Sequence, residues 1–237
     1  CSIASILWSI YKTDEIPPTE EELAKLEHYF DRLWPICRSL TGDGVRESLD
    51  ILGEEMDLKT SAIKSGEQVF DWTVPKEWRI RDAYIVCPDG RKIAQFKENN
   101  LHVLNYSTPV DRMVSLEELK AHLYSLPSMP EAVPYVTSYY KEKWGFCVSH
   151  EELERLEDGE YRVFIDSELF DGELNYAEAV LEGKSGKEIL FSTYICHPSM
   201  ANNELSGPLA TLMLYRRLKA IKNRKFTYRF LFAPETI

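Results

Sequence analysis

Apolar residues recur every three or four positions in two stretches near the start of the chain, and this spacing predicts two amphipathic helices. The first helix follows Thr19, where the letters TEEE form a capping box between Thr19 and Glu22 ahead of LAKLEHYFDRLWPICRSL. The second helix covers TGDGVRESLDILGEEM (41–56), which opens on a Gly-Asp-Gly turn. The next stretch, DLKTSAIKS (57–65), is predicted to be a strand.

Short alternating runs rich in aromatic residues occupy residues 70–107, and they predict a β-rich module. A Pro-Asp-Gly turn at 88–90 falls between two of these runs. A helix with its own capping box is predicted at 115–126. We therefore expect an inserted β-rich subdomain over residues 66–126.

Two long alternating runs come after a proline-rich link. They cover 161–169 and 172–183, and the turn LFDGEL between them predicts two strands that pair antiparallel.

A strand-helix-strand pattern ends the chain. The run KEILFSTYIC (187–196) is apolar on both faces, which is typical of a central strand. A helix is predicted at 207–222 and a further strand at 225–235. This order predicts a crossover between two parallel strands of one sheet.

The elements together predict an α/β protein with a mixed, largely parallel sheet, flanking helices and an inserted β-rich subdomain. Its parts are an N-terminal helical part (1–65), the insertion (66–126) and an α/β part (127–237). A chain of 237 residues is long enough for one domain with an insertion. The sequence opens without Met and stops just after a strand, so we expect the α/β domain to continue beyond Ile237.

Charge and cysteine content narrow the classes of partner. The net charge of −11 and the shortness of the basic runs argue against nucleic-acid binding through this chain. No apolar run approaches the roughly 20 residues that span a bilayer, so no membrane partner is expected. The cysteines are odd in number and scattered, which predicts reduced thiols and a cytoplasmic protein. They are Cys1, Cys37, Cys87, Cys147 and Cys196.

Polar groups follow both strands of the predicted crossover. His197 follows the first strand and Glu235 follows the second, while Asn202, Asn203 and Glu204 precede the helix between them. The carboxyl ends of parallel strands meet at one edge of a sheet, beside the positive end of the helix, so these groups are expected to converge. An imidazole with oxygen ligands suits a divalent metal, above all zinc. A helix N-cap built from the same His-Pro turn and Asn-Asn pair is the alternative.

Several stretches also resemble the di-zinc aminopeptidase superfamily. The segments STYICHPSMANNELSGPLA and FLFAPETI are similar to its metal-site region. More closely, motifs along nearly all of the chain resemble a bacterial group of aminopeptidase-like proteins of unknown function, which have an inserted β domain and, in full length, a C-terminal winged helix. These motifs are SLTGDGVRESLDIL, VFDWTVPKEWRIRDAYI, LNYSTPV, VPYVTSYYKEKWGFCVS and CHPSMANNELSGP.

The resemblance implies roles for individual residues. His197 matches the first metal-binding histidine, and Glu235 matches the first of two glutamates, the general base. Asn203 stands at the position of a bridging aspartate, and Thr236 stands where a second, metal-binding glutamate is expected. An amide bridges two cations poorly. Glu204, one residue on, supplies the missing charge only if the loop is shifted, and this point stays open.

Three functions follow from these residues. The leading hypothesis is a metal-dependent hydrolase of peptide or small amide substrates, with one or two zinc ions held in the full-length protein. Its remaining ligands, an aspartate and a histidine by the resemblance, would lie beyond Ile237. The alternative is a catalytically degenerate scaffold with a binding, regulatory or polysaccharide-linked role. A third reading, a carbohydrate-processing hydrolase with Glu204 and Glu235 as acid and base, requires carboxyl groups about 5–10 Å apart. Self-association is left open.

Overall fold

The computed structural model describes residues 17–235, and the contacts within the chain divide them into two compact units. The first unit combines the residues up to Glu67 with those from Glu173 onward, and the second runs from Gln68 to Gly172. Each unit has a four-stranded sheet of its own.

The first unit is built on a sheet of mixed orientation with the strand order β1-β10-β12-β11. Its strands are β1 (Lys59–Lys64), β10 (Glu173–Leu181), β11 (Glu188–Tyr194) and β12 (Thr227–Ala233). Strand β10 runs antiparallel to both β1 and β12, whereas β11 and β12 are parallel. The predicted crossover is therefore confirmed, and it sets the ends of β11 and β12 at one edge of the sheet.

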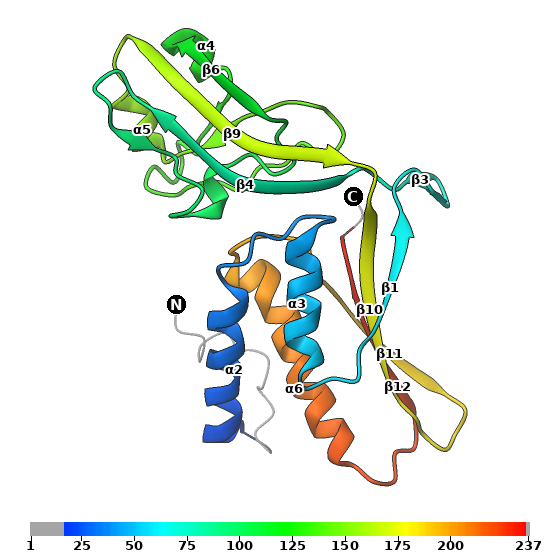
Figure 1. The fold of residues 1–237 in the computed structure, drawn as a ribbon. Helices are drawn as coiled ribbons and strands as arrows, with labels where there is room; N and C mark the ends of the chain where they lie inside the picture. Colours follow the sequence, from blue (N-terminus) through cyan, green and yellow to red (C-terminus); the bar gives the residue numbers. More distant parts are fainter. Residues whose placement is uncertain (1–16, 236–237) are drawn as a thin grey trace. The chain divides into compact units, whose positions relative to one another are not determined.

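Three helices cover one side of this sheet (Figure 1): α2 (Glu20–Leu33), α3 (Asp43–Gly53) and α6 (Ser206–Ala220). Their apolar faces and the strands share one hydrophobic core, to which each helix contributes fully buried leucines. The capping box is confirmed at the start of α2, where the Thr19 hydroxyl accepts from the Glu22 backbone and the Glu22 carboxylate accepts from the Thr19 backbone.

Close backbone contact holds the segment between α2 and α3 in place. A Cβ atom added to Gly44 would lie 2.1 Å from the carbonyl oxygen of Cys37, so only glycine allows α3 to begin so near this segment. The segment carries Arg38, which reaches the candidate site described below.

The second unit is a β-rich module with an antiparallel sheet of order β5-β4-β9-β6. Its strands are β4 (Glu77–Val86), β5 (Lys92–Ile93), β6 (Val110–Ser115) and β9 (Glu160–Phe170). Shorter elements complete the unit: β2 (Gln68–Val69), β3 (Trp72–Thr73), the 3₁₀ turn η1 (Asn100–His102), α4 (Leu116–Lys120), β7 (Leu123–Tyr124), β8 (Phe146–Cys147) and α5 (His150–Glu154).

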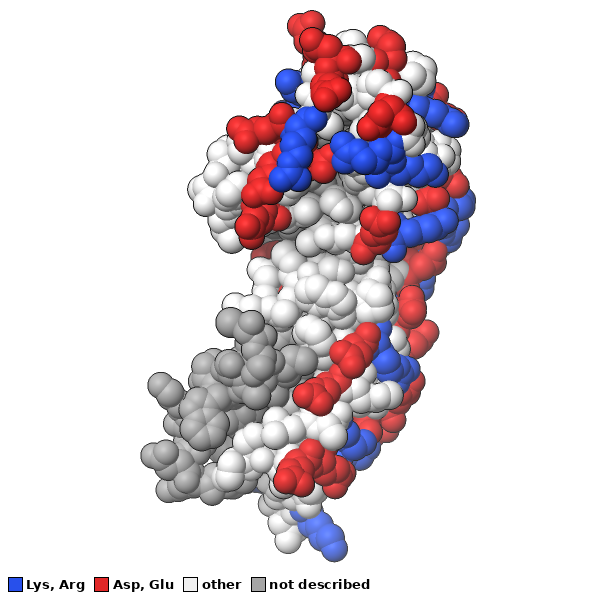
Figure 2. All heavy atoms as spheres, turned by 90° about the vertical axis from the view of Figure 1, so that its left-hand side faces the viewer, with Lys and Arg blue, Asp and Glu red and all other residues white. Residues whose placement is uncertain are grey.

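Ion pairs cross the exposed face of this second sheet. Arg81 on β4 pairs with Asp166 on β9, and Arg162 on β9 pairs with Asp111 on β6, both at 2.9 Å. Figure 2 likewise shows basic side chains interspersed with acidic ones on the face toward the viewer. Exposed pairs of this kind stabilise a sheet by at most about 1 kcal/mol each.

Four predicted features differ from the structure. Strands β9 and β10 do not pair with each other: β9 lies between β4 and β6, and the turn LFDGEL links the two units. The insertion consequently extends to Gly172 instead of ending near residue 126, because β9 belongs to it. The predicted helix at 115–126 is short, since α4 ends at Lys120.

Strand β11 was expected in the centre of the sheet, but among the described strands it lies at the edge and pairs with β12 alone. Ile189 and Leu190 are 36% and 55% exposed, while the residues just past the strand, Ile195 and Cys196, are buried. None of the described helices is long and apolar enough to span a membrane.

Candidate active site

His197 and Glu235 meet at the edge of the first unit's sheet, just past the ends of β11 and β12. Their Nε2 and Oε2 atoms are 2.9 Å apart. Because a carboxylate only accepts hydrogen bonds, Nε2 carries the proton and donates it to Glu235. The ring of His197 is buried, whereas the Glu235 side chain is 40% exposed, so the pair opens to solvent on the glutamate side.

Cys196 closes a small hydrogen-bonded ring with the same two residues. The Glu235 backbone N–H donates to Cys196 Sγ at 3.2 Å, and Sγ lies 3.4 Å from His197 Nδ1. With the proton of the imidazole on Nε2, Nδ1 accepts from the thiol. Burial raises the pKa of Cys196, and the nearby carboxylate of Glu204 raises it further. The thiol therefore stays neutral and is a poor nucleophile.

A π-helical turn, η2 (Ala201–Leu205), determines which side chain of the Asn-Asn-Glu run faces Cys196 and His197. The Leu205 N–H reaches the carbonyl oxygen of Met200 at 3.1 Å, five residues back, so the turn holds one residue more than an α-helical turn. Glu204 is completely buried as a result, while Asn203 is exposed. The backbone carbonyl of Asn203 accepts from the Tyr194 hydroxyl at 2.5 Å, which fixes the turn to β11.

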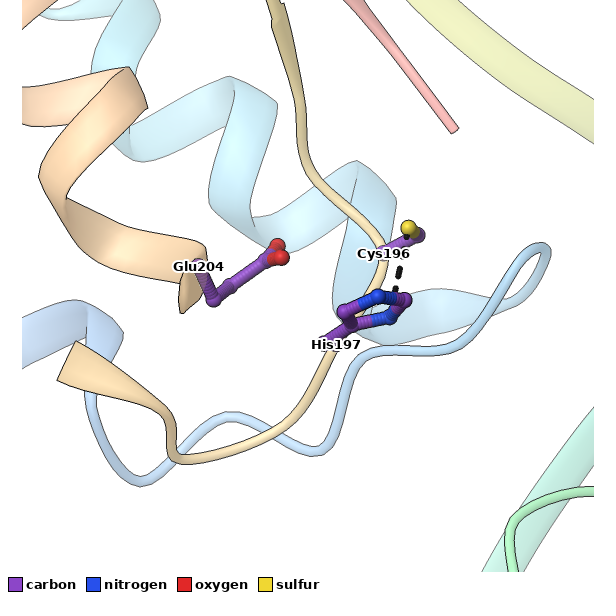
Figure 3. Close-up of side chains that lie close together, drawn as sticks. All are labelled: Cys196, His197 and Glu204. Atoms are coloured by element: carbon purple, nitrogen blue, oxygen red, sulfur yellow. Dashed lines mark hydrogen bonds between the residues drawn. The ribbon is translucent and has the colours of Figure 1, made fainter. Parts of the chain in front are cut away.

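Glu204 points toward Cys196 and His197 from the turn ahead of α6 (Figure 3). One ligand atom from each of the three residues lies within 4.8 Å of the others, the spacing of a group that could hold a metal ion. In the part of the chain that the structure describes, neither carboxylate oxygen of Glu204 has a hydrogen-bond partner.

The charged partner of Glu204 is Arg38, whose Nε lies 3.5 Å from Glu204 Oε1, with both side chains fully buried. The same Nε donates to the carbonyl oxygen of His197 at 2.9 Å. Sequence reasoning missed Arg38. The signal for it in the sequence is a single cation within the mostly apolar run WPICRSL between two helices.

Burial dominates the protonation of this pair. It raises the pKa of Glu204, and the Arg38 guanidinium and the nearby backbone N–H groups of His197 and Cys196 oppose this effect only in part. Burial also lowers the pKa of Arg38. A guanidinium nevertheless remains charged in proteins, so Arg38 is a permanent cation beside Glu204.

The residues expected at the site are thus only partly brought together. His197, Glu204 and Glu235 converge on one edge of the sheet, and Asn203 is exposed next to them. Thr236 lies outside the described residues, as does Cys1. The four described cysteines are free thiols. Zinc binds imidazole nitrogens and carboxylate oxygens. The two carboxylate oxygens of Glu204 accept no hydrogen bond from the described residues, so whether they bind a metal ion is the point to test.

Comparisons with known proteins agree with this architecture. A family model described as a domain of unknown function, DUF4910, matches residues 27–237. A protein of Clostridium acetobutylicum, provisionally described as a polysaccharide biosynthesis protein with an aminopeptidase-like domain, is 47% identical over 222 residues. The match covers 94% of this chain and 51% of that protein, so the chain spans about half the length of this relative.

Solved structures give the same fold. A crystal structure from Clostridium acetobutylicum, provisionally named a peptidase, has a TM-score of 0.88 at 47% identity and covers 91% of this chain and 51% of its own. A Peptidase M28 precursor from Shewanella amazonensis has a TM-score of 0.57 at 9% identity, with 90% and 63% covered. A zinc aminopeptidase from Bacillus subtilis has a TM-score of 0.54 at 11% identity, with 87% and 60% covered. The last two likenesses concern the fold alone.

Proposed function

The chain belongs to the DUF4910 family of aminopeptidase-like domains, and we propose that it forms part of a metal-dependent hydrolase that cleaves peptide or amide bonds. The observation that carries the proposal is the 2.9 Å contact between His197 Nε2 and Glu235 Oε2 at the shared edge of two parallel strands. An imidazole and a partly exposed carboxylate at this edge are the groups that such chemistry requires.

His197 is the residue of this chain that would hold a zinc ion or a similar divalent metal, through Nε2 after this nitrogen has released its proton. When bound, such an ion polarises a carbonyl group and lowers the pKa of water. The carboxylate of Glu235, open to solvent on one side, accepts a proton from water and passes it to the leaving amine. The thiol of Cys196 and the backbone of the strand ends keep the imidazole in one orientation.

A peptide with a free amino terminus fits the charge of the chain, because a net charge of −11 favours a cationic substrate group. The relative from Clostridium acetobutylicum is named for polysaccharide biosynthesis, so an amide of an amino sugar is a second substrate class to assay.

The test uses the complete protein that carries this chain, reconstituted with zinc and assayed for amine release from aminoacyl p-nitroanilides. Glu235→Gln is expected to lower kcat by about 10²–10⁴-fold with the metal retained, because it removes the proton acceptor. His197→Gln is expected to lose the metal. Glu188→Gln is the matched control, since Glu188 is a partly exposed carboxylate at the opposite end of β11.

A specific observation favours a second candidate, a scaffold without hydrolytic activity. The exposed Asn203 and the internal pairing of Glu204 with Arg38 leave fewer carboxylates for metal ions than the resemblance implies. Wild-type protein that binds no zinc, even when zinc is supplied, and releases no amine from any substrate would contradict the hydrolase and support the scaffold.

A further inference from the structure

Glu204 has the burial and the position of a metal ligand, but a cation already lies beside it. Its carboxylate is completely buried, close to Cys196 and His197. The guanidinium of Arg38, equally buried, lies 3.5 Å from it. A second positive charge at the same carboxylate would face the first across a few ångströms of protein with little water to screen the repulsion.

Arg38 is fixed in this position by several elements of the first unit. Its Nη1 donates to the carbonyl oxygen of Leu33 at the end of α2 (2.7 Å) and to the Ser48 hydroxyl on α3 (3.2 Å). Its Nε donates to the carbonyl oxygen of His197. The guanidinium therefore cannot swing away from Glu204 to admit a metal ion without the loss of three buried hydrogen bonds.

The other members of the cluster also have partners. Nδ1 of His197 is occupied by the Cys196 thiol, and the same sulfur accepts from the backbone N–H of Glu235. Among the described residues of this cluster, Glu235 is the one whose side chain is open to solvent, and its carboxylate accepts from His197 Nε2. Asn203, where the sequence suggested a bridging ligand, is exposed and offers an amide.

We propose that Arg38 is a built-in cation that stands in for a second metal ion at this site. Glu204 is neutralised from inside the protein and does not ligate, so the site binds one divalent ion, held in this chain by His197, while Glu235 remains the proton acceptor. Glu204 and Arg38 are then positioning residues: they join the loop after β11 to the segment between α2 and α3 and so hold the His197 backbone. This inference rests on the proposed function and specifies its metal content.

Metal counting tests the inference without reference to activity. The complete protein is stripped with chelator, reconstituted with zinc, dialysed and analysed for zinc per chain, and cobalt is titrated in parallel by its visible absorption. One equivalent is expected for wild type and for Glu204→Gln, and none for His197→Gln. Glu188→Gln, the control on β11, is expected to keep one equivalent.

Glu204→Gln leaves Arg38 buried beside an uncharged group and can unfold the chain. The double variant Arg38→Met/Glu204→Leu removes both charges, and it too is expected to keep one equivalent. Two equivalents in wild type, or loss of the metal from either Glu204 variant in folded form, would overturn the inference while leaving the hydrolase intact. No metal in wild type would instead contradict the proposed function, and this inference with it.

Discussion

Arg38→Met is expected to be among the most destabilising single substitutions in the first unit. The variant keeps an unbranched apolar stem but leaves the Glu204 carboxylate buried without a cation. At 3.5 Å and an effective dielectric constant of about 20, the lost attraction is about 5 kcal/mol, and removing one partner of a buried ion pair typically costs about 3–5 kcal/mol. Domains are stable by only about 5–15 kcal/mol, so the change takes a large share of the total.

Urea unfolding followed by circular dichroism measures this loss as a shift in midpoint at constant slope. Arg38→Met/Glu204→Leu is the companion variant: it removes the stranded carboxylate as well, and it should recover more than half of the loss. Ser48→Ala is a milder control, because it removes one of the hydrogen bonds of Arg38 and should cost about 1 kcal/mol.

The pH dependence of Arg38→Met provides a second signature. The pKa of Glu204 is already raised in the folded chain, and it rises further without Arg38. A group with a raised folded pKa stabilises the fold only while it is protonated, so stability falls as pH increases from the unfolded value of about 4.3 through the folded pKa. The deficit should therefore be larger at pH 8 than at pH 5. A deficit below about 1 kcal/mol, or one that does not vary with pH, would refute the argument.

Two further predictions concern the stability of the fold at acid pH and the orientation of the side chain at position 203. Arg217 lowers the pKa of Glu22 to about 2 from 4.5, so the ion pair stabilises the fold above pH 4.5 and this contribution is lost as pH falls toward 2. Glu22→Gln should therefore lower the free energy of unfolding by about 1–2 kcal/mol at pH 7 and leave it unchanged at pH 2. An equal loss at both pH values in urea titrations would count against the ion pair. Asn203→Asp should leave the metal count at one, because residue 203 is exposed, and a second zinc equivalent in that variant would show that the side chain can turn inward.

The local part of the fold could be predicted from sequence because local rules decide it. The capping box at Thr19 and the strand-helix-strand pattern before Glu235 depend on residues close together in the chain, and both are found in the structure. Strand partners are not local. Alternation shows that 161–169 and 172–183 are strands, but it does not show which other strands they join, and each pairs in a different unit.

The candidate site could likewise be predicted only in part from the sequence. His197 and Glu235 could be placed together because parallel strands end at one edge of a sheet. Arg38 could not be placed there, because its contact with the loop after β11 joins residues far apart in the chain and depends on the packing of α3 around Gly44.

The π-helical turn and the buried guanidinium of Arg38 depend on each other structurally. A regular α-helical start would be shorter by one residue than the turn that ends at Leu205, and the extra residue brings a carboxylate inward in place of an amide. A buried carboxylate without a cation is costly, and neither oxygen of Glu204 accepts a hydrogen bond from the described residues. Arg38 supplies the charge, and its hydrogen bond to the His197 carbonyl couples the loop to the imidazole. The π-helical turn thus places the Glu204 carboxylate inside the protein and leaves Asn203 exposed, and the buried guanidinium of Arg38 balances the charge that the turn brings in.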